Sequence, residues 1–220
     1  MSGSGEDRGA RESEVPAGER LLRLFWALDL PGPTLDLVEG WQRSQGASRA
    51  TLRAVPRDSL HVTLAFLGER PERDLEAISA AAQGLGSGPV PAAFDGLPRP
   101  IGARPPRLFA LRVESSAAER LQAELAARLV AIGAYADPRE PDRRPFWPHL
   151  TVFRVRRGRP GSGDAPASHR LGPLPVGERG GHAFGFVRVS LYLSETRPEG
   201  ASYSRLAANE LPQQGGRQKR

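Results

Sequence analysis

His61-Val62-Thr63-Leu64 and His149-Leu150-Thr151-Val152 are two tetrapeptides with one pattern, in which a histidine and a threonine alternate with apolar residues. Alternate residues of a β-strand point to the same face, so each histidine projects with its threonine while the apolar residues project the other way. The chain contains four histidines, and two of them occur in this duplicated setting. We therefore predict two strands that present two imidazoles and two hydroxyls on one surface.

The segments around the two motifs follow a similar order of strands and helices. Periodicity and turn residues predict, in the first half, a strand at 21–30, a helix at 34–43, a strand at 51–55, the motif strand at 60–67 that Gly68 ends, and a helix from Pro71. In the second half, the pattern predicts strands at 90–94, 107–113, 149–155, 186–193 and 202–207, of which 149–155 is the motif strand. It also predicts a helix that buries Leu121, Leu125 and Leu129 and begins with Ser116 and Glu119 as a capping box. This repeat favours an α+β or mixed α/β fold with two similar lobes around a shared cleft.

The segments outside this pattern are polar and rich in glycine or proline. We expect residues 1–19 to form a disordered N-terminal tail, 20–210 a single two-lobed domain, and 211–220 a disordered basic tail. Residues 157–181 have no periodicity and predict a long, mobile loop. We assign His169 and His182 to this loop region and interpret them as solvated surface residues.

Composition excludes several classes of site. The chain has no cysteine, which excludes disulfides, thiolate catalysis and cysteine-bound zinc. No apolar run approaches the ~20 residues that span a bilayer, and the N-terminus lacks the apolar centre of a signal peptide, so we expect a cytoplasmic protein without a membrane partner. The net charge of +6 permits a polyanionic partner. However, every basic residue except Lys219 is arginine, a skew that a GC-rich genome produces without any function.

Two imidazoles on one surface suit acid–base catalysis at a phosphodiester. The unperturbed pKa of histidine is near ~6.5, so a neutral ring can act as general base and a protonated ring as general acid. The hydroxyls of Thr63 and Thr151 can donate to the non-bridging phosphoryl oxygens, which carry charge through the transition state. A 2′,3′-cyclic phosphate is a natural substrate for metal-free chemistry, because its strained ring opens more readily than a linear diester. The residues themselves leave open which imidazole is the acid.

Arg154 is a further candidate for phosphate binding, since arginine binds phosphate in a bidentate manner. It lies five positions after His149, and a flat strand sends such residues to opposite faces. A bend or bulge is therefore needed to bring Arg154 to the same surface. No acidic or histidine ligand stands at metal-site spacing near His61 or His149, so we expect no metal and no other cofactor.

Longer stretches around the motifs resemble a known family. They are RLFWALDLP at 23–31, LHVTLAFLG at 60–68, PRLFAL at 106–111 and FWPHLTVFR at 146–154, followed by Ser194, Gly200 and Tyr203. In this order they resemble the two-histidine phosphoesterase superfamily, and within it the LigT/ThpR-like branch of bacterial and archaeal RNA 2′,3′-cyclic phosphodiesterases. The resemblance spans residues 22–206.

The resemblance implies an α+β fold in which two pseudo-symmetric lobes of antiparallel sheet, with outer helices, surround a central cleft. It implies a phosphoric diester hydrolase that converts 2′,3′-cyclic phosphate ends of RNA, or cyclic nucleotides, to 2′-phosphates without metal, and the reverse type of reaction, 2′–5′ ligation of RNA. The family's usual assignment makes His61 the proton donor and His149 the proton acceptor. Thr63, Thr151 and Arg154 then bind the phosphate, and we expect the protein to be a monomer.

Two departures from the family pattern leave the substrate open. Arg53-Ala54 stands where relatives often have an aromatic residue after the arginine, and the segment 157–181 is rich in glycine and proline. One alternative is a phosphodiesterase of the same fold that acts on another cyclic or 2′–5′ linked nucleotide. Another is a non-catalytic RNA-binding module, which would bind RNA with strong salt dependence and without turnover.

Overall fold

The computed structural model describes residues 18–45, 52–86, 88–102, 106–137, 145–156, 171–175, 182–197 and 200–212. Most of both predicted tails and most of the predicted loop at 157–181 lie outside these residues, as does His169. Within the described part, no helix has the length and apolar character that crossing a membrane requires.

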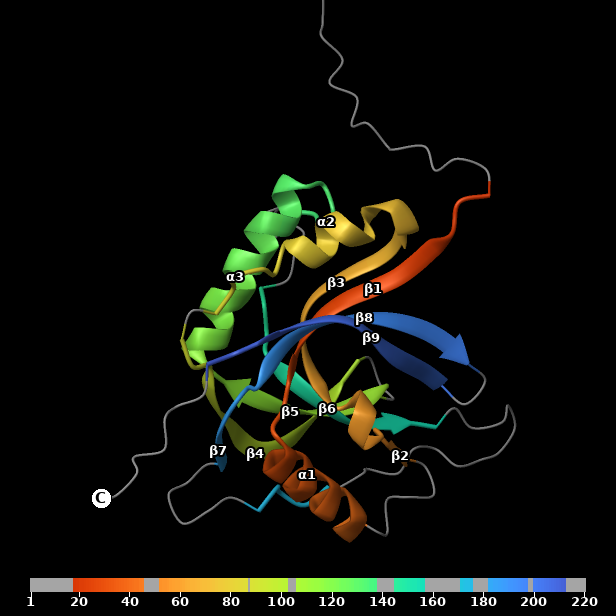
Figure 1. The fold of residues 1–220 in the computed structure, drawn as a ribbon. Helices are drawn as coiled ribbons and strands as arrows, with labels where there is room; N and C mark the ends of the chain where they lie inside the picture. The colour runs from red at the N-terminus through yellow and green to blue at the C-terminus, as the bar shows by residue number, and fades with distance from the viewer. Residues whose placement is uncertain are drawn as a thin grey trace, which may run out of the picture.

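One antiparallel sheet forms the framework of the described chain (Figure 1). Its strands are β1 (Leu21–Asp29), β2 (Leu52–Ala54), β3 (His61–Pro71), β4 (Pro91–Ile101), β5 (Leu108–Glu114), β6 (His149–Val155), β7 (His182–Gly185), β8 (Arg188–Arg197) and β9 (Gly200–Glu210). Their order is β7-β4-β5-β6-β3-β1-β8-β9, and the short β2 also pairs with β6. The helices are α1 (Gly32–Ser44), α2 (Leu75–Ala80) and α3 (Ser116–Ala131), with 3-10 turns at Arg57–Ser59 and Glu72–Asp74. Antiparallel strands with segregated helices agree with the predicted α+β class.

The two motif strands, β3 and β6, are neighbours in the middle of the sheet. They run antiparallel and pair at Val62 and Leu150, both fully buried and each directly after a motif histidine. On one side of this pair lie β1, β8 and β9, and on the other β5, β4 and β7. The two expected lobes are therefore the halves of one continuous curled sheet, related by an approximate twofold axis at this pair.

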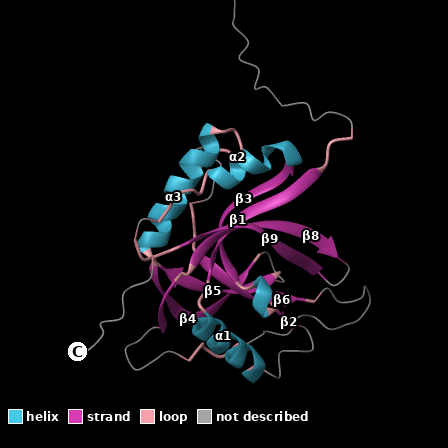
Figure 2. Cartoon of the chain, in the orientation of Figure 1, coloured by secondary structure: helices cyan, strands magenta, loops and turns pink. Residues whose placement is uncertain are grey.

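The helices pack on the apolar side of the sheet and leave the motif side chains on the other side. α1 follows β1 in sequence but packs against β6, where the rings of Trp41 and Phe153 meet edge to face with centroids 5.6 Å apart. α2 and α3 lie together at the opposite end of the molecule, and α3 contacts β3 and β4 (Figures 1 and 2). Val62 and Leu64 of β3 are buried in the core, whereas the intervening Thr63 is not.

Some elements differ from the prediction in their extent. Gly68 does not end the motif strand, because its φ of +71° is accommodated within β3, which continues to Pro71. The N-cap of α3 is Ser115 rather than Ser116, since the Ser115 hydroxyl accepts a hydrogen bond from the N–H of Ala118 at 3.0 Å. β4 and β9 are longer than expected, because they pair with their neighbours beyond the short apolar segments that indicated them.

Three segments expected to be loop or tail are ordered by contacts with the domain. Trp41 Nε1 donates to the carbonyl of Gly172 at 3.1 Å, and Leu174 is buried, so 171–175 is anchored to the fold. His182 is not a loop residue, because it is half-buried at the start of β7. The C-terminal tail begins later than residue 211, since Leu211 is buried in the core.

Leu150→Ala is expected to lower the free energy of unfolding by about 2–5 kcal/mol, the usual cost of truncating a buried leucine and leaving a cavity. Leu97→Ala is the matched control, because Leu97 is 58% exposed, and its effect should stay within about 0.5 kcal/mol. Chemical denaturation followed by circular dichroism measures both. Equally small effects would show that the pairing of β3 with β6 does not hold the halves together.

Candidate active site

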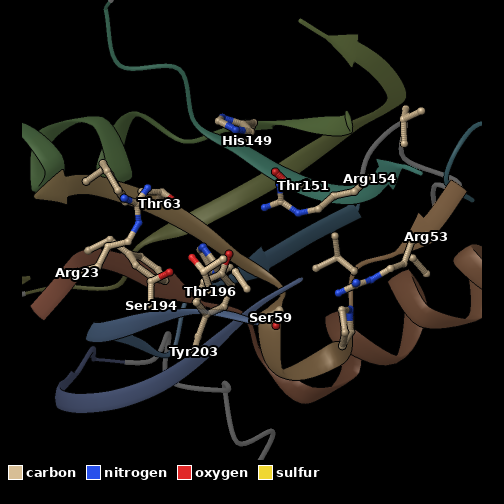
Figure 3. A pocket seen from close by; sticks show the side chains of 18 of the residues that line it. Arg23, Arg53, Ser59, Thr63, His149, Thr151, Arg154, Ser194, Thr196 and Tyr203 are labelled. Carbon is tan, nitrogen blue, oxygen red and sulfur yellow. The ribbon is translucent and has the colours of Figure 1, made fainter. Parts of the chain in front are cut away.

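Both motif strands line a single open cleft of about 1090 Å³ (Figure 3). It contains all five residues that the sequence predicted to act together, namely His61, Thr63, His149, Thr151 and Arg154. The other polar and aromatic side chains around it are Arg23, Phe25, Arg53, Ser59, Phe66, Arg156, Ser194, Thr196 and Tyr203. Two tetrapeptides from distant parts of the chain therefore form one site.

The pairing of β3 with β6 explains how the four motif side chains come together. β3 and β6 pair in antiparallel register at Val62 and Leu150. Continued by one residue in each direction, this register places His61 on the side of Thr151 and Thr63 on the side of His149. Each imidazole is thus matched with the threonine of the other motif, on the face opposite the core.

Arg154 reaches the cleft because β6 contains a bulge. The consecutive β5 residues Phe109 and Ala110 pair with β6 residues that are two apart, so Val152 is an extra residue in β6. A bulge of this kind shifts the alternation of side chains that follow it. Val152 and Phe153 are consequently both buried, and Arg154 lines the cleft with the motif histidine. The bend that the sequence required is present.

β3 contains the equivalent bulge. The consecutive β1 residues Trp26 and Ala27 pair with β3 residues that are two apart, which makes Leu64 the extra residue. The same order of buried and open positions follows, and Phe66, five residues after the motif histidine, lines the cleft with 48% of its surface exposed. Phe66 and Arg154 therefore occupy equivalent positions in the two halves and differ in chemistry.

A side chain from α1 holds the bulge of β6. Gln42 Nε2 donates to the carbonyl oxygen of Val152 at 2.7 Å and to that of Val55 at 3.1 Å. The N–H of Val55 donates to the same Val152 carbonyl at 3.0 Å. Gln42 is 4% exposed, so these bonds form away from water. Gln42 thus helps to orient Arg154 although it does not line the cleft.

The ring of His149 is fixed by Trp147. His149 Nδ1 lies 2.8 Å from the carbonyl oxygen of Trp147, and the indole stacks on the imidazole with centroids 4.6 Å apart. A carbonyl only accepts hydrogen bonds, so Nδ1 carries the hydrogen and Nε2 of the neutral ring has a free lone pair. His61 is held in a related way, by a backbone hydrogen bond with Ser59, also two residues before it.

Burial lowers the pKa of His61 from its ordinary value of 6.5 to about 4. The hydrogen bond with Ser59 opposes this effect, and the positive charges of Arg154 and His149 lower the pKa further. The His61 ring is therefore neutral at pH 7 in the free protein. The influence of Arg154 and His149 on His61 also shows that all three groups share one electrostatic environment. An anion bound among them favours the protonated form of His61.

Three aromatic rings from other strands pack around His61. The ring centroids of Phe25, Tyr203 and Tyr192 lie 4.8, 5.3 and 6.0 Å from that of His61. The Tyr192 hydroxyl donates to the carboxylate of Asp29 at 2.8 Å, which fixes the tyrosine in place. These contacts supply the desolvation that keeps the imidazole neutral.

Two arginines that the sequence did not assign to the site, Arg23 and Arg53, also line the cleft, as does Arg156 directly after β6. Arg53 enters through β2, which pairs with β6 so that Arg53 stands opposite Arg154. Arg23 lies over the ring of Phe66, with its guanidinium carbon 4.6 Å from the ring centroid. Alternation along the first strand could have indicated Arg23, because the apolar residues on either side of it are buried. A three-residue strand such as β2 gives no comparable signal.

The chemical character of the cleft suits an anion. Arginine, histidine and hydroxyl side chains line it, and no carboxylate does so among the lining residues of the described chain. In that part of the chain, no three His, Cys, Asp or Glu side chains are grouped so that they could hold a metal ion. Guanidinium, imidazole and hydroxyl donors are typical of a phosphate-binding site.

Known proteins share both the sequence and the fold. The sequence model of the LigT-like phosphoesterase family matches residues 28–98. An RNA 2′,3′-cyclic phosphodiesterase of Thermus thermophilus is 31% identical over 203 residues, which cover 90% of this chain and 94% of that protein. The chain belongs to the LigT-like phosphoesterase family.

Two further proteins agree with this assignment. An RNA 2′,3′-cyclic phosphodiesterase of Escherichia coli is 29% identical over 132 residues, which cover 60% of this chain and 71% of that protein. A crystal structure of a Thermus thermophilus protein matches with a TM-score of 0.70 and 27% identity over 88% of this chain and 100% of that chain. The predicted family and the LigT-like α+β fold are confirmed.

Gln42→Leu is expected to lower the free energy of unfolding by about 1–3 kcal/mol, because the buried carbonyl of Val152 loses a hydrogen-bond donor. Binding of inorganic phosphate should weaken as well, since Arg154 loses the support of the bulge. Urea denaturation and calorimetric titration measure the two effects. The control is Gln83→Leu, at an exposed position, which should change neither. Unchanged stability and phosphate affinity in Gln42→Leu would contradict the role assigned to this residue.

The low pKa of His61 predicts a pH dependence of stability. The unfolded chain takes up a proton at His61 near pH 6.5, whereas the folded protein does so only near about 4. Between these values the unfolded state binds more protons, so the free energy of unfolding falls as the pH is lowered, by at most about 1.4 kcal/mol per pH unit for one group. His61→Gln should have a shallower slope than the wild type from pH 6.5 downward in urea denaturation. Parallel slopes would be inconsistent with a partly buried imidazole whose pKa is lowered.

Proposed function

We propose that this protein is an RNA 2′,3′-cyclic phosphodiesterase that opens the cyclic phosphate of an RNA end to a 2′-phosphate by two-histidine acid–base catalysis. The observation that carries the proposal is the convergence of His61 and His149, each matched with a threonine, on one anion-binding cleft. The activity named for the relatives from T. thermophilus and E. coli supports the substrate class.

The phosphate is held by the groups between the two imidazoles. Thr63 and Thr151 donate their hydroxyl hydrogens to the two non-bridging oxygens, one from each motif. Arg154 adds a charge-assisted bond to the same group, with the orientation that the β6 bulge gives it. Fixed donors at these oxygens stabilise the charge that they carry in the transition state.

His149 is the general base. Its Nδ1 hydrogen is committed to the Trp147 carbonyl, so Nε2 is free to accept a proton from water. The water oxygen then forms a bond to phosphorus, and the bond between phosphorus and the ribose 3′ oxygen breaks. The electron pair of that bond leaves with the 3′ oxygen, and the 2′ ester remains.

His61 is the general acid that gives a proton to the departing 3′ oxygen. In the free protein its pKa is about 4, so the ring is uncharged at neutral pH. The anionic substrate offsets the charge of Arg154 and favours the imidazolium, so the acid becomes charged when the phosphate is in place. At the end of the cycle the proton taken by His149 and the proton lost by His61 are exchanged with water.

His61→Ala and His149→Ala are each expected to lower kcat for hydrolysis of adenosine 2′,3′-cyclic phosphate by about 10²–10⁴-fold, the usual contribution of one acid–base group. His182→Ala is the matched control, because His182 lies in β7 outside the cleft, and it should keep wild-type turnover. Chromatography of the product identifies the phosphate isomer, and the same assay in EDTA measures any need for a metal.

Formation of the 2′-phosphate by the wild type in EDTA, with loss of turnover in both cleft variants, is the expected result. Hydrolysis at the wild-type rate in the double variant would refute the assignment of the histidines. If the wild type binds RNA with a steep salt dependence and turns over no cyclic phosphate, the protein is a binding module instead. Turnover only of other cyclic or 2′–5′ linked nucleotides would keep the fold and change the substrate.

A further inference from the structure

The cleft carries more positive charge than one phosphate requires. Four arginines line it, Arg23, Arg53, Arg154 and Arg156, and the described lining residues include no carboxylate. A single cyclic phosphate diester has one negative charge. This accumulation of positive charge without a carboxylate contrasts with the places in the described chain where arginines are paired with acidic side chains.

Several arginines outside the cleft form ion pairs with carboxylates. Arg57 bonds both Asp36 and Glu39 at 2.7 Å. Arg128 bonds Glu124 at 2.6 Å. The pairs of Arg20 with Glu72, Arg99 with Asp95 and Arg188 with Glu210 follow the same pattern. In the described part of the chain, by contrast, no ion pair is formed by the arginines of the cleft.

Two of the cleft arginines stand directly opposite each other. Arg53 of β2 and Arg154 of β6 are cross-strand partners, a placement in which like charges destabilise a sheet. Arg156 follows at the end of the same strand and is exposed. In Figure 3 the side chains of Arg53 and Arg154 both extend from this end toward the middle of the cleft. An anion bound beside the two arginines offsets their repulsion. This arrangement therefore favours a ligand with a negative charge beyond that of the reacting phosphate.

The other end of the cleft differs. The position equivalent to Arg154 is Phe66, and Arg23 is engaged over its ring. The excess of unengaged charge is therefore confined to the end formed by β2 and β6. The two ends of the cleft therefore differ in charge, although the strands that form them are arranged in a similar way.

We propose that Arg53 and Arg156 form a second phosphate subsite, which binds the phosphate on the 5′ side of the nucleotide whose cyclic phosphate is opened. The inference rests on the proposed function and names its substrate class, a nucleotide that carries both a 2′,3′-cyclic phosphate and a second phosphate across the ribose. Arg154 contacts the reacting phosphate, and its cross-strand neighbour contacts the next one. The second phosphate comes either from an internucleotide linkage of RNA or from a free 5′-phosphate.

Three substrates test the proposal by their kcat/KM at low ionic strength. They are adenosine 2′,3′-cyclic phosphate, its 5′-phosphorylated form, and the dinucleotide ApA with a 2′,3′-cyclic end. A second phosphate should raise kcat/KM by about tenfold or more, as charge-assisted hydrogen bonds to two arginines allow. Added salt should reduce this advantage. A gain with the dinucleotide alone identifies RNA, and a gain with both identifies any 5′-phosphate.

The variants Arg53→Gln and Arg156→Gln are expected to reduce the ratio of kcat/KM between doubly and singly phosphorylated substrates by about fivefold or more, a loss in the range of one charged hydrogen bond. Arg120→Gln, at an exposed position on α3, is the control and should leave the ratio unchanged. Thermal unfolding without ligand should show Arg53→Gln to be at least as stable as the wild type, because a like-charge pair is removed.

The outcomes separate this subsite from the proposed function. Absence of turnover with all three substrates overturns the proposed function and the subsite with it. Turnover of all three with equal kcat/KM in the wild type overturns the subsite alone. So does a clear preference for the second phosphate that survives both arginine substitutions.

Discussion

The pairing of Val62 with Leu150 fixes how the two motif strands lie against each other. The antiparallel register at this pair decides which residues of β3 lie beside which residues of β6. Because both side chains are fully buried, a shift of one residue in either strand would turn the motif histidine and threonine into the core. Burial of the apolar residues on one face of the sheet therefore keeps the motif histidines and threonines on the other face.

Each of the two motif strands contains a bulge at the same place relative to its motif. Each occurs after the motif threonine, at Leu64 in β3 and at Val152 in β6, and each brings the residue five positions after the histidine to the cleft. In one half that residue is Phe66 and in the other it is Arg154. The bulge after the motif is equivalent in the two strands. The difference between Phe66 and Arg154 gives the cleft an aromatic end and a charged end.

The sequence predicted the parts of the site that depend on local pattern. Alternation was sufficient to place His61 with Thr63 and His149 with Thr151. The odd spacing of five residues from His149 to Arg154 correctly predicted a bulge between them. Contacts between distant segments were not visible in the same way. The role of Gln42 depends on α1 packing against β6, which periodicity does not reveal.

The remaining differences have similar causes. Arg53 was not assigned to the site because β2 has three residues and its partner lies far along the chain. The glycine- and proline-rich segment before His182 predicts a loop there, although β7 begins at this residue. Gly68 was expected to end its strand, yet a glycine with positive φ continues inside β3. Local sequence pattern predicted where the strands occur, whereas pairing between distant segments determined where they end and which strands lie beside them.

A crystal structure of the protein with orthovanadate, which resembles a phosphoryl group during attack, tests whether the two imidazoles converge on one phosphorus atom. We expect one vanadate in the cleft, with Nε2 of His149 and the ring of His61 on opposite sides of it and the hydroxyls of Thr63 and Thr151 on its equatorial oxygens. A vanadate that contacts only one of the two imidazoles, or that binds outside the cleft, would show that the two histidines do not act on one phosphoryl group.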